Sequence, residues 1–459
     1  MRTTRNSSAG SRGPGRSLIG ACLVAVVLFG SVRAAQAIDV RGFVYLEGDY
    51  QDINTKSPLN PDDIYELNKV QNFIRGTVTL KSPVGESATG VIKLEGQSYP
   101  VRFMQTPDFS DQQQNPNTQT RSQNNQINGT AESNDKIFLK EIYIDAHHKH
   151  FSVRAGKQYV KWGSSMFFFP IDVINYHRDP LRPLDEAEGN PMLNLSIPFE
   201  SYLQLELIGV VRYGDTNKPQ NVPGIAKLSF SHDRISGFYF AQVQSESRPV
   251  YGLNLEYAFS PVRDLSLTLY AQGLYKFDSS RSRVVPDDRE TYVVRDMDRD
   301  GYFAGVAGGR AVYNFTETKW IDGIEFALEY YYDEDNWSRN DYERYCDYLD
   351  HVRTVDPANA KYHHYLALSY YRMFKNSRQY AYSMLSLQNV ILTDLTLGIE
   401  YVHNIEDGSG LLVPGGAYRF DNGEAEFGAR VFINWGGSTS EFGTLMQRIM
   451  GLAYIQKSF

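Results

Sequence analysis

Apolar and polar residues alternate along much of this chain. Within residues 265–277 the odd-numbered positions are mostly apolar and most even-numbered ones polar, and residues 324–333, 395–404 and 425–434 repeat the pattern. Successive side chains of a strand point to opposite faces, so each segment predicts a strand with one apolar and one polar face. These strands are about twice as long as the roughly five or six residues of an ordinary strand. They reach the about 9 to 11 residues that a tilted strand needs to cross an outer membrane.

Short and long connectors alternate between the predicted strands. Short connectors, such as residues 82–85 and 421–424, contain the Gly, Pro, Asn and Asp that tight turns require. Short turns at one end and long loops at the other are typical of outer-membrane barrels. The connector at residues 104–135, rich in Gln and Asn, predicts an exposed and disordered loop. The long connectors are residues 52–63, 104–135, 164–189, 278–300 and 336–377.

Together these patterns predict an all-β fold, a transmembrane antiparallel β-barrel of about 18 strands, with 16 as the alternative. Residues 362–374 stay open between a further strand and a loop, and an even strand count favours the loop. The predicted strands are residues 40–50, 66–81, 88–103, 136–147, 150–163, 190–199, 201–213, 223–233, 235–246, 250–260, 264–277, 301–316, 321–335, 377–391, 393–406, 411–421, 424–435 and 444–459.

The first 37 residues predict a cleaved secretory signal peptide. A basic start that includes Arg2 and Arg16 precedes the apolar run Leu18 to Phe29, and Ala35-Gln36-Ala37 supplies small residues at a cleavage site. The alternative is a membrane anchor, but the apolar run is shorter than the roughly 20 residues of a spanning helix. We therefore expect residues 38–459 to form one outer-membrane barrel in a Gram-negative bacterium, exported through the secretory pathway.

Composition excludes several other classes of protein. Cys346 is the only cysteine after residue 37, which excludes a disulfide scaffold and a zinc–cysteine site. The net charge of −8 argues against a nucleic-acid partner. After residue 37, no uninterrupted apolar stretch approaches the length of a spanning helix, so a helical membrane protein is excluded. The 32 Tyr and 25 Phe suit the rims of a barrel, although a soluble all-β protein could also carry them.

Charged residues on the polar faces are the candidate lining of a pore. A dry core would leave such charges unpaired at a cost of several kcal/mol each, whereas a water-filled lumen accepts them. The alternative is a sandwich with its charged faces in solvent, which predicts shorter strands. The candidates are Arg75, Lys93, Glu95, Glu141, Asp145, Arg154, Glu256, Glu329, Glu400, Glu426 and Arg430.

One stretch of the chain resembles a known group of barrels. Residues 154–163 read RAGKQYVKWG, residues 172–175 read DVIN, and Arg178-Asp179-Pro180 follows. This stretch resembles porin-like outer-membrane barrels of the alginate-export type and related barrels without settled roles. The resemblance implies that residues 164–189 fold over or into the lumen. The candidate constriction residues of this segment are Asp172, Asn175, Arg178 and Asp179. The terminal Phe459 resembles the signal that the barrel-insertion machinery recognises.

The sequence gives only weak signs of metal or catalytic chemistry. Asp296, Asp298 and Asp300 begin a calcium-loop pattern, but Ala307 stands where the bidentate glutamate belongs, so a polar loop is the simpler interpretation. Apart from this calcium site, no cofactor is expected. A rim enzyme would need a histidine near a serine and an acid, and no motif spacing selects such a set. The candidate histidines are His351, His363, His364 and His403.

We therefore expect a porin-like channel for the diffusion or export of solutes, and no enzyme. The alternative is the barrel of an envelope export or assembly complex with polysaccharide, lipid or electron-carrier cargo. Expected partners are outer-membrane lipid, the barrel-insertion machinery and, for the alternative, periplasmic export proteins. The cargo, the gating and the oligomeric state are not determined by the sequence.

Overall fold

The computed structural model describes residues 38–101, 135–175, 188–211, 222–244, 247–279, 281–286, 292–296, 301–316, 318, 320–355, 360–368, 370–371, 376–420 and 423–459. The expected signal peptide at residues 1–37 lies outside this described part of the chain. Most of the Gln- and Asn-rich connector at residues 104–135 also lies outside it, and so the structure does not address either expectation.

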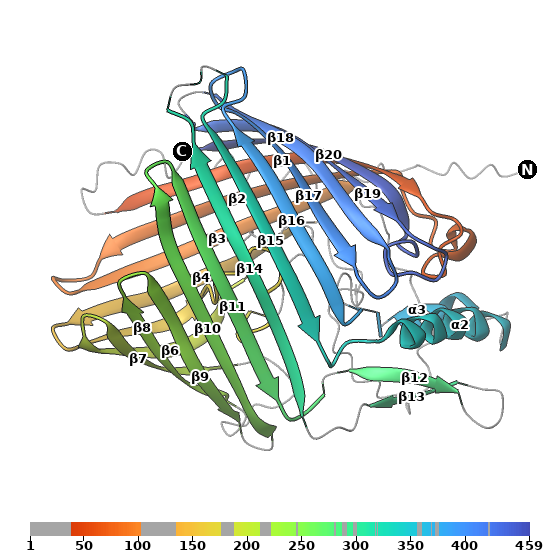
Figure 1. The fold of residues 1–459 in the computed structure, drawn as a ribbon, viewed down its shortest axis with the longest axis horizontal. Coiled ribbons are helices and arrows are strands. Elements are labelled where there is room, and N and C mark those ends of the chain that lie inside the picture. The colour runs from red at the N-terminus through yellow and green to blue at the C-terminus, as the bar shows by residue number, and fades with distance from the viewer. Residues whose placement is uncertain are drawn as a thin grey trace, which may run out of the picture.

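Eighteen of the described strands form one closed antiparallel sheet (Figure 1). Each strand pairs with its neighbour along the chain, and β1 also pairs with β20, which closes the barrel. The predicted β-barrel is confirmed, the count of 18 is correct and the alternative of 16 is wrong. The strands are β1 (Asp39–Ile53), β2 (Val70–Pro83), β3 (Ala88–Val101), β4 (Asp135–His148), β5 (Phe151–Gln158), β6 (Asn190–Glu200), β7 (Leu203–Val210), β8 (Gly224–His232), β9 (Ile235–Gln244), β10 (Ser247–Val262), β11 (Leu265–Lys276), β14 (Tyr302–Asn314), β15 (Gly323–Asp333), β16 (Gln379–Gln388), β17 (Leu395–Asn404), β18 (Gly410–Phe420), β19 (Ala425–Trp435) and β20 (Gln447–Ser458).

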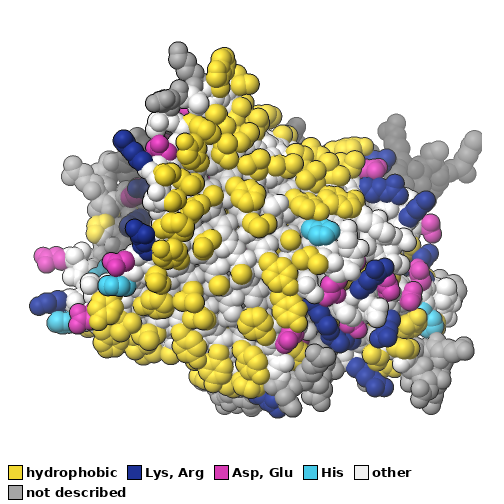
Figure 2. Space-filling model, viewed as in Figure 1, with side chains coloured by type: hydrophobic (Ala, Val, Ile, Leu, Met, Phe, Trp, Pro, Cys, Tyr) yellow, Lys and Arg dark blue, Asp and Glu magenta, His cyan; other side chains and the backbone are white. Residues whose placement is uncertain are grey.

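The two faces of the barrel differ in chemistry as the alternation predicts. On β10, Leu253 and Leu255 are 41% and 40% exposed on the outside, while Asn254 between them is buried on the inside. Figure 2 shows hydrophobic side chains across the strands and charged ones gathered toward the two ends. Among the described residues there is no helix whose length and apolar character suit a membrane crossing.

The two ends of the barrel differ in the length of their connectors. One end carries short turns, such as the two residues between β8 and β9, where Asp233 has a positive φ of 50°. The C-terminus lies at this end, away from the helices (Figure 1). There the backbone N–H of Phe459 donates to the carbonyl of Gly42 at 3.0 Å, and that of Gly42 donates to the carbonyl of Phe459 at 3.0 Å.

The long connectors contain helices and strands that the hydrophobic pattern does not predict. Residues 278–300 include the hairpin β12 (Ser282–Pro286) and β13 (Tyr292–Asp296), which is separate from the barrel. Residues 336–377 include α2 (Arg339–Val355) and α3 (Ala360–Leu368). Within residues 362–374, the part that the structure describes contains the end of α3 and no strand, which favours the loop. These elements lie at the end opposite the short turns (Figure 1).

Candidate functional site

The register of the sheet shows which side chains face the interior. Arg75 pairs with Tyr45, which is buried, while the neighbouring Val44 and Leu46 are exposed on the outer face. Directly paired residues share a face, so Arg75 points inward. The same reasoning from strand to strand places all eleven candidate lining residues on the inner face: Arg75, Lys93, Glu95, Glu141, Asp145, Arg154, Glu256, Glu329, Glu400, Glu426 and Arg430.

Acidic and basic side chains pair with one another across the inner wall. Arg154 Nη2 lies 2.5 Å from Asp145 Oδ2, and Arg430 Nη1 lies 3.7 Å from Glu400 Oε1. These two arginine side chains nevertheless stay 39% and 42% exposed. Such pairing offsets the cost of enclosing charges, while the exposed portion can still meet a solute. Further inner-wall pairs are Lys93–Glu141, Lys227–Glu206, Arg310–Glu325 and Arg419–Glu426.

Glu95 does not line a passage, which corrects one expectation. A register shift after Lys93 gives β4 one extra residue, and this bulge turns Lys140 toward the inside. Lys140 Nζ then lies 2.8 Å from Glu95 Oε2, and the amide of Gln97 donates to Glu95 Oε1 at 2.7 Å. Glu95 is only 2% exposed, because these partners enclose it. Its charge stabilises the β3–β4 contact.

The segment after β5, residues 159–175, folds into the barrel. Trp162, Ile171 and Ile174 are fully buried there, in a cluster with inward side chains of β6 to β9 such as Phe240. The Trp162 ring meets the Phe240 ring edge-on at 4.8 Å, and Lys227 Nζ lies 5.6 Å from the Trp162 ring. Burial of these rings against the wall supplies the apolar part of the attachment. We call residues 159–175 the inner loop.

Five successive backbone N–H groups attach the inner loop to the wall. Glu329 of β15 accepts hydrogen bonds from the N–H groups of Met166, Phe167 at 3.1 Å and Phe168 at 3.2 Å. Gln272 of β11, with its amide oriented to satisfy its neighbours, accepts from Ser164 N at 2.7 Å and Ser165 N at 2.9 Å. Charge-assisted hydrogen bonds are the strong ones, so Glu329 is the main polar anchor.

Glu329 is a second correction to the expected pore lining. Its side chain is inward but only 1% exposed, because the inner loop covers it. The hydroxyl of Tyr270 also donates to Glu329 Oε1 at 2.8 Å. All these donors point at one carboxylate, which offsets the cost of burying a negative charge. Glu329 therefore holds the loop instead of meeting solutes.

Two glycines of the RAGKQYVKWG stretch permit this path. Gly156 has φ +131°, and a Cβ there would lie 2.2 Å from the carbonyl oxygen of Ile142. Gly163 has φ +84°, and a Cβ there would lie 2.4 Å from the Gln272 amide. Only glycine has no Cβ and adopts such backbone angles without strain.

Glu141, an expected lining residue, accepts a hydrogen bond from Tyr159 N at 3.2 Å where β5 ends.

The candidate constriction residues have a structural role where the structure describes them. Asp172 Oδ1 accepts from Asn175 N at 3.0 Å, and the Asn175 side chain donates to the carbonyl of Val160. Asn175 is buried, so it stabilises the fold of the inner loop and does not border a passage. Arg178 and Asp179 lie outside the described residues.

Where the structure describes them, the remaining candidates do not gather into a site. Asp298 and Asp300 of the weak calcium pattern lie outside the described residues, and the side chain of Asp296 at the end of β13 is also not described. In the described part of the chain, no group of three His, Cys, Asp or Glu side chains is arranged to hold a metal ion. The four candidate catalytic histidines each contact a tyrosine: the rings of His351 and Tyr292 lie 5.2 Å apart, those of His363 and Tyr362 5.7 Å apart, and the hydroxyls of Tyr65 and Tyr401 lie 2.8 Å and 3.1 Å from Nδ1 of His364 and His403.

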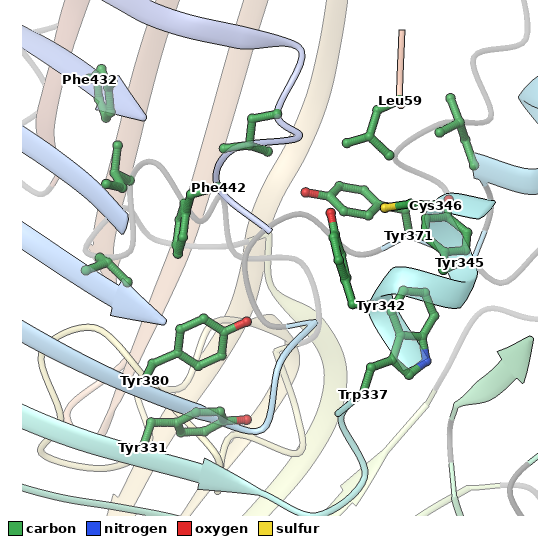
Figure 3. Packing of buried hydrophobic residues seen from close by; sticks show 14 of the residues in the cluster. Leu59, Tyr331, Trp337, Tyr342, Tyr345, Cys346, Tyr371, Tyr380, Phe432 and Phe442 are labelled. Atoms are coloured by element: carbon green, nitrogen blue, oxygen red, sulfur yellow. The ribbon is translucent and has the colours of Figure 1, made fainter. Parts of the chain in front are cut away.

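The helices and the β1–β2 connector form a layer at the loop end of the barrel, which we call the cap (α2, α3 and residues 54–69). From α2, Tyr342, Tyr345 and Cys346 point toward Leu59 and other buried side chains in Figure 3. The apolar positions of α2 recur every three or four residues, which gives the helix one buried face.

The cap and the inner loop belong to one apolar cluster. The ring of Phe168 stacks on Tyr331 at 4.6 Å, and Tyr331 lies beside Tyr380 on the barrel side of Figure 3. Tyr342 Oη of α2 lies 2.5 Å from Thr444 Oγ1 in the β19–β20 connector. Contacts therefore run from α2 to the barrel wall and to the inner loop.

A family model matches residues 101–335, slightly more than half of the chain; it is described as a protein of unknown function, DUF1302. The chain belongs to the DUF1302 family. The matched stretch contains the RAGKQYVKWG residues, the inner loop and Glu329. No curated protein matches the sequence.

Solved porins have the same fold as this DUF1302 protein. OccAB1 of Acinetobacter baumannii matches with a TM-score of 0.54 and 10% identity over 92% of this chain and 96% of that one. A BenF-like porin of Pseudomonas fluorescens gives 0.52 and 10%, with 92% and 98% coverage. OccK2 of Pseudomonas aeruginosa, solved in complex with glucuronate, also gives 0.52 and 10%, with 92% and 98% coverage. At these identities the similarity establishes the porin-like barrel fold.

Several residues that build the interior were not among the site residues predicted from the sequence. Gln272, Lys140 and Arg310 face inward, but none of them was among the candidates. One signal was available: residues 166–171 read MFFFPI, an apolar run inside a connector. An apolar run between strands indicates a segment that packs on something, and here it packs inside the barrel.

Proposed function

We propose that this DUF1302 protein is an outer-membrane channel for small polar solutes. The observation that carries the proposal is the opposite chemistry of the two barrel faces. Exposed apolar side chains cover the outer face over far more area than soluble monomers tolerate, which suits lipid. The enclosed inner wall carries partly exposed charged side chains, which suits water and polar solutes.

The inner loop is the proposed constriction of this channel. It occupies the interior at the level of Glu329, and hydrogen bonds fix its position. Below it, toward the short turns, partly exposed arginines of the inner wall include Arg154 and Arg310. A guanidinium group binds carboxylates well, so small acidic sugars are the first solutes to test. A solved porin of the same fold binds glucuronate, which supports this choice.

Reconstitution of the purified barrel into planar lipid bilayers tests the proposal. We expect stepwise single-channel conductance, and a concentration-dependent block of current by glucuronate. A barrel that migrates in its folded, heat-modifiable form and never conducts would contradict the channel function.

A charge reversal at Arg154 should change the ion selectivity. Arg154→Glu places a second carboxylate beside Asp145 at a position that is 39% exposed to the interior. We expect the ratio of cation to anion permeability to rise about two- to fivefold, because like charges in an enclosed pore concentrate counter-ions. Reversal potentials in a salt gradient measure this ratio. The control is Arg41→Glu, the same charge change at a strand end where the side chain is 79% exposed; an equal shift there would contradict a role for Arg154.

The cap favours a second candidate, the barrel of an envelope export or assembly complex. An apolar cluster spanning the cap, the wall and the inner loop is the arrangement expected of a barrel that opens only with a partner. Purification from membranes with periplasmic partners, together with absence of conductance by the isolated barrel, would favour this candidate over a free-standing channel.

A further inference from the structure

Within the cap, one buried histidine connects α3 to the β1–β2 connector. His364 of α3 has no exposed surface and lies between two residues of the β1–β2 connector. Its Nδ1 lies 2.8 Å from Tyr65 Oη, and its Nε2 lies 2.7 Å from the carbonyl oxygen of Pro58. The ring of Tyr65 is itself buried in the apolar cluster of the cap.

The hydrogen bonds fix the protonation state of His364. A carbonyl oxygen only accepts, so Nε2 carries the proton and donates it to Pro58. Burial raises the pKa of Tyr65, so its hydroxyl stays protonated and donates to Nδ1. Both bonds are therefore made by the neutral imidazole. A second proton would have to be placed on Nδ1, where Tyr65 now donates.

The charged groups that the structure describes near His364 do not compensate a positive imidazole. Arg353 of α2 disfavours a protonated His364, whereas Asp350 favours it. Arg353 also forms an ion pair with the β1–β2 connector, because its Nη2 lies 3.5 Å from Asp62 Oδ2. On the connector side, Lys361 Nζ of α3 lies 6.0 Å from the Tyr65 ring. Burial outweighs these charges and the hydrogen bond to the Pro58 carbonyl, which favours the protonated ring, and it lowers the pKa of His364 from 6.5 to about 4.

We propose that the cap is an acid-sensitive gate, in which protonation of His364 places a charge in a buried site and a second N–H against the donating Tyr65 hydroxyl, and so releases α3 and α2 from the loop end of the barrel. In the open cap His364 is hydrated and titrates near its ordinary value. The closed cap is thus fully favoured above about pH 6.5. As the pH falls, the closed-to-open ratio drops up to tenfold per pH unit, by about 150-fold at pH 4 and about 300-fold at still lower pH.

Opening of the cap would also reach the inner loop. Cys346 and Tyr342 of α2 belong to the apolar cluster that contains Phe168 of the inner loop. Release of α2 removes part of the packing that holds Phe168 against Tyr331. An effect on conductance rests on the proposed channel function, whereas the opening of the cap does not.

Cys346 gives a direct measurement of cap opening. It is 3% exposed and is the one cysteine among the described residues, and burial raises the pKa of its thiol, so it is unreactive in the closed cap. Dithiodipyridine reacts with thiols at acid pH. The rate at which Cys346 of the folded barrel reacts with this reagent is measured at pH 7.5 and at pH 5. Each rate is divided by the rate of the denatured chain at the same pH, which removes the pH dependence of the reagent itself. We expect this relative rate to rise at least about tenfold at pH 5.

Two variants test whether His364 is the sensor. His364→Gln keeps an amide that can donate to Pro58 and cannot take up a proton, so the acid response should disappear. The control His363→Gln changes the adjacent histidine and should keep the response. An equal relative rate at both pH values in the unaltered barrel, or an unchanged acid response in His364→Gln, would overturn the proposal.

A third variant covers the case in which the glutamine disturbs the cap. Tyr65→Phe removes only the hydroxyl that favours neutral His364. The midpoint of the acid response should then move to higher pH. If His364→Gln is labelled rapidly at both pH values and Tyr65→Phe keeps the original midpoint, the gate is not controlled by this histidine and the proposal fails.

Discussion

Replacing Glu329 with Gln is expected to detach the inner loop and raise the single-channel conductance severalfold. The carboxylate now accepts from three loop N–H groups and from the hydroxyl of Tyr270. A glutamine presents one oxygen and an NH₂ group that faces other donors, so at least one buried donor loses its partner. Loss of charge-assisted bonds and an unpaired buried donor together cost about 3 kcal/mol in the attachment of the loop.

A matched control separates this effect from a general change of charge. Glu325→Gln removes another inward carboxylate of the same strand, whose partner is Arg310 at 2.6 Å and not the loop. Conductance and its open-state noise are compared in planar bilayers, and limited proteolysis within residues 159–175 reports on the loop. If Glu329→Gln conducts like the unaltered barrel and its loop resists protease equally, the loop is held by its apolar contacts alone.

Gly156→Ala is expected to prevent the barrel from assembling. The new Cβ would lie 2.2 Å from a backbone carbonyl oxygen and 2.7 Å from the Tyr143 Cα, so β4 and β5 must separate. The backbone at φ +131° is also strained for any residue with a Cβ. We expect a loss of at least about 3 kcal/mol from the free energy of unfolding, seen as disappearance of the folded, heat-modifiable species.

Gly85→Ala is the control for backbone strain without a clash. Gly85 has φ +74° in the turn between β2 and β3, and no atom lies within 4 Å of the position that a Cβ would take there. Its cost should be about 1 kcal/mol, because only the left-handed backbone is penalised. Equal damage by the two substitutions would show that the close approach of Gly156 to Ile142 and Tyr143 is unimportant.

The interior combines two kinds of attachment with different sensitivities. The inner loop is held by Glu329 and Gln272 from the wall and by Trp162 in an apolar cluster. The cap is held by aromatic packing and by the two hydrogen bonds of His364. The inner loop should therefore respond to substitution of Glu329, and the cap to protonation of His364.

The barrel itself could be predicted from the sequence. Each strand carries its own two-residue alternation, as β11 and β15 do, and this local pattern also says which face meets lipid. For the same reason the inward direction of Arg154 and Glu329 followed from the sequence. The connectors favoured 18 strands, because short turns and long loops must alternate around a closed sheet, but they left 16 open.

The tertiary structure decided what the inward side chains do. Glu329 meets Phe167 N across 162 positions of sequence, and no local pattern shows that a lining carboxylate will be covered by a loop. Lys140 turns inward because of a bulge, which depends on the pairing of β3 with β4. His364 is buried only because the β1–β2 connector packs on α3. Alternation is a property of neighbours in sequence, whereas burial and pairing depend on residues that only the closed barrel brings together.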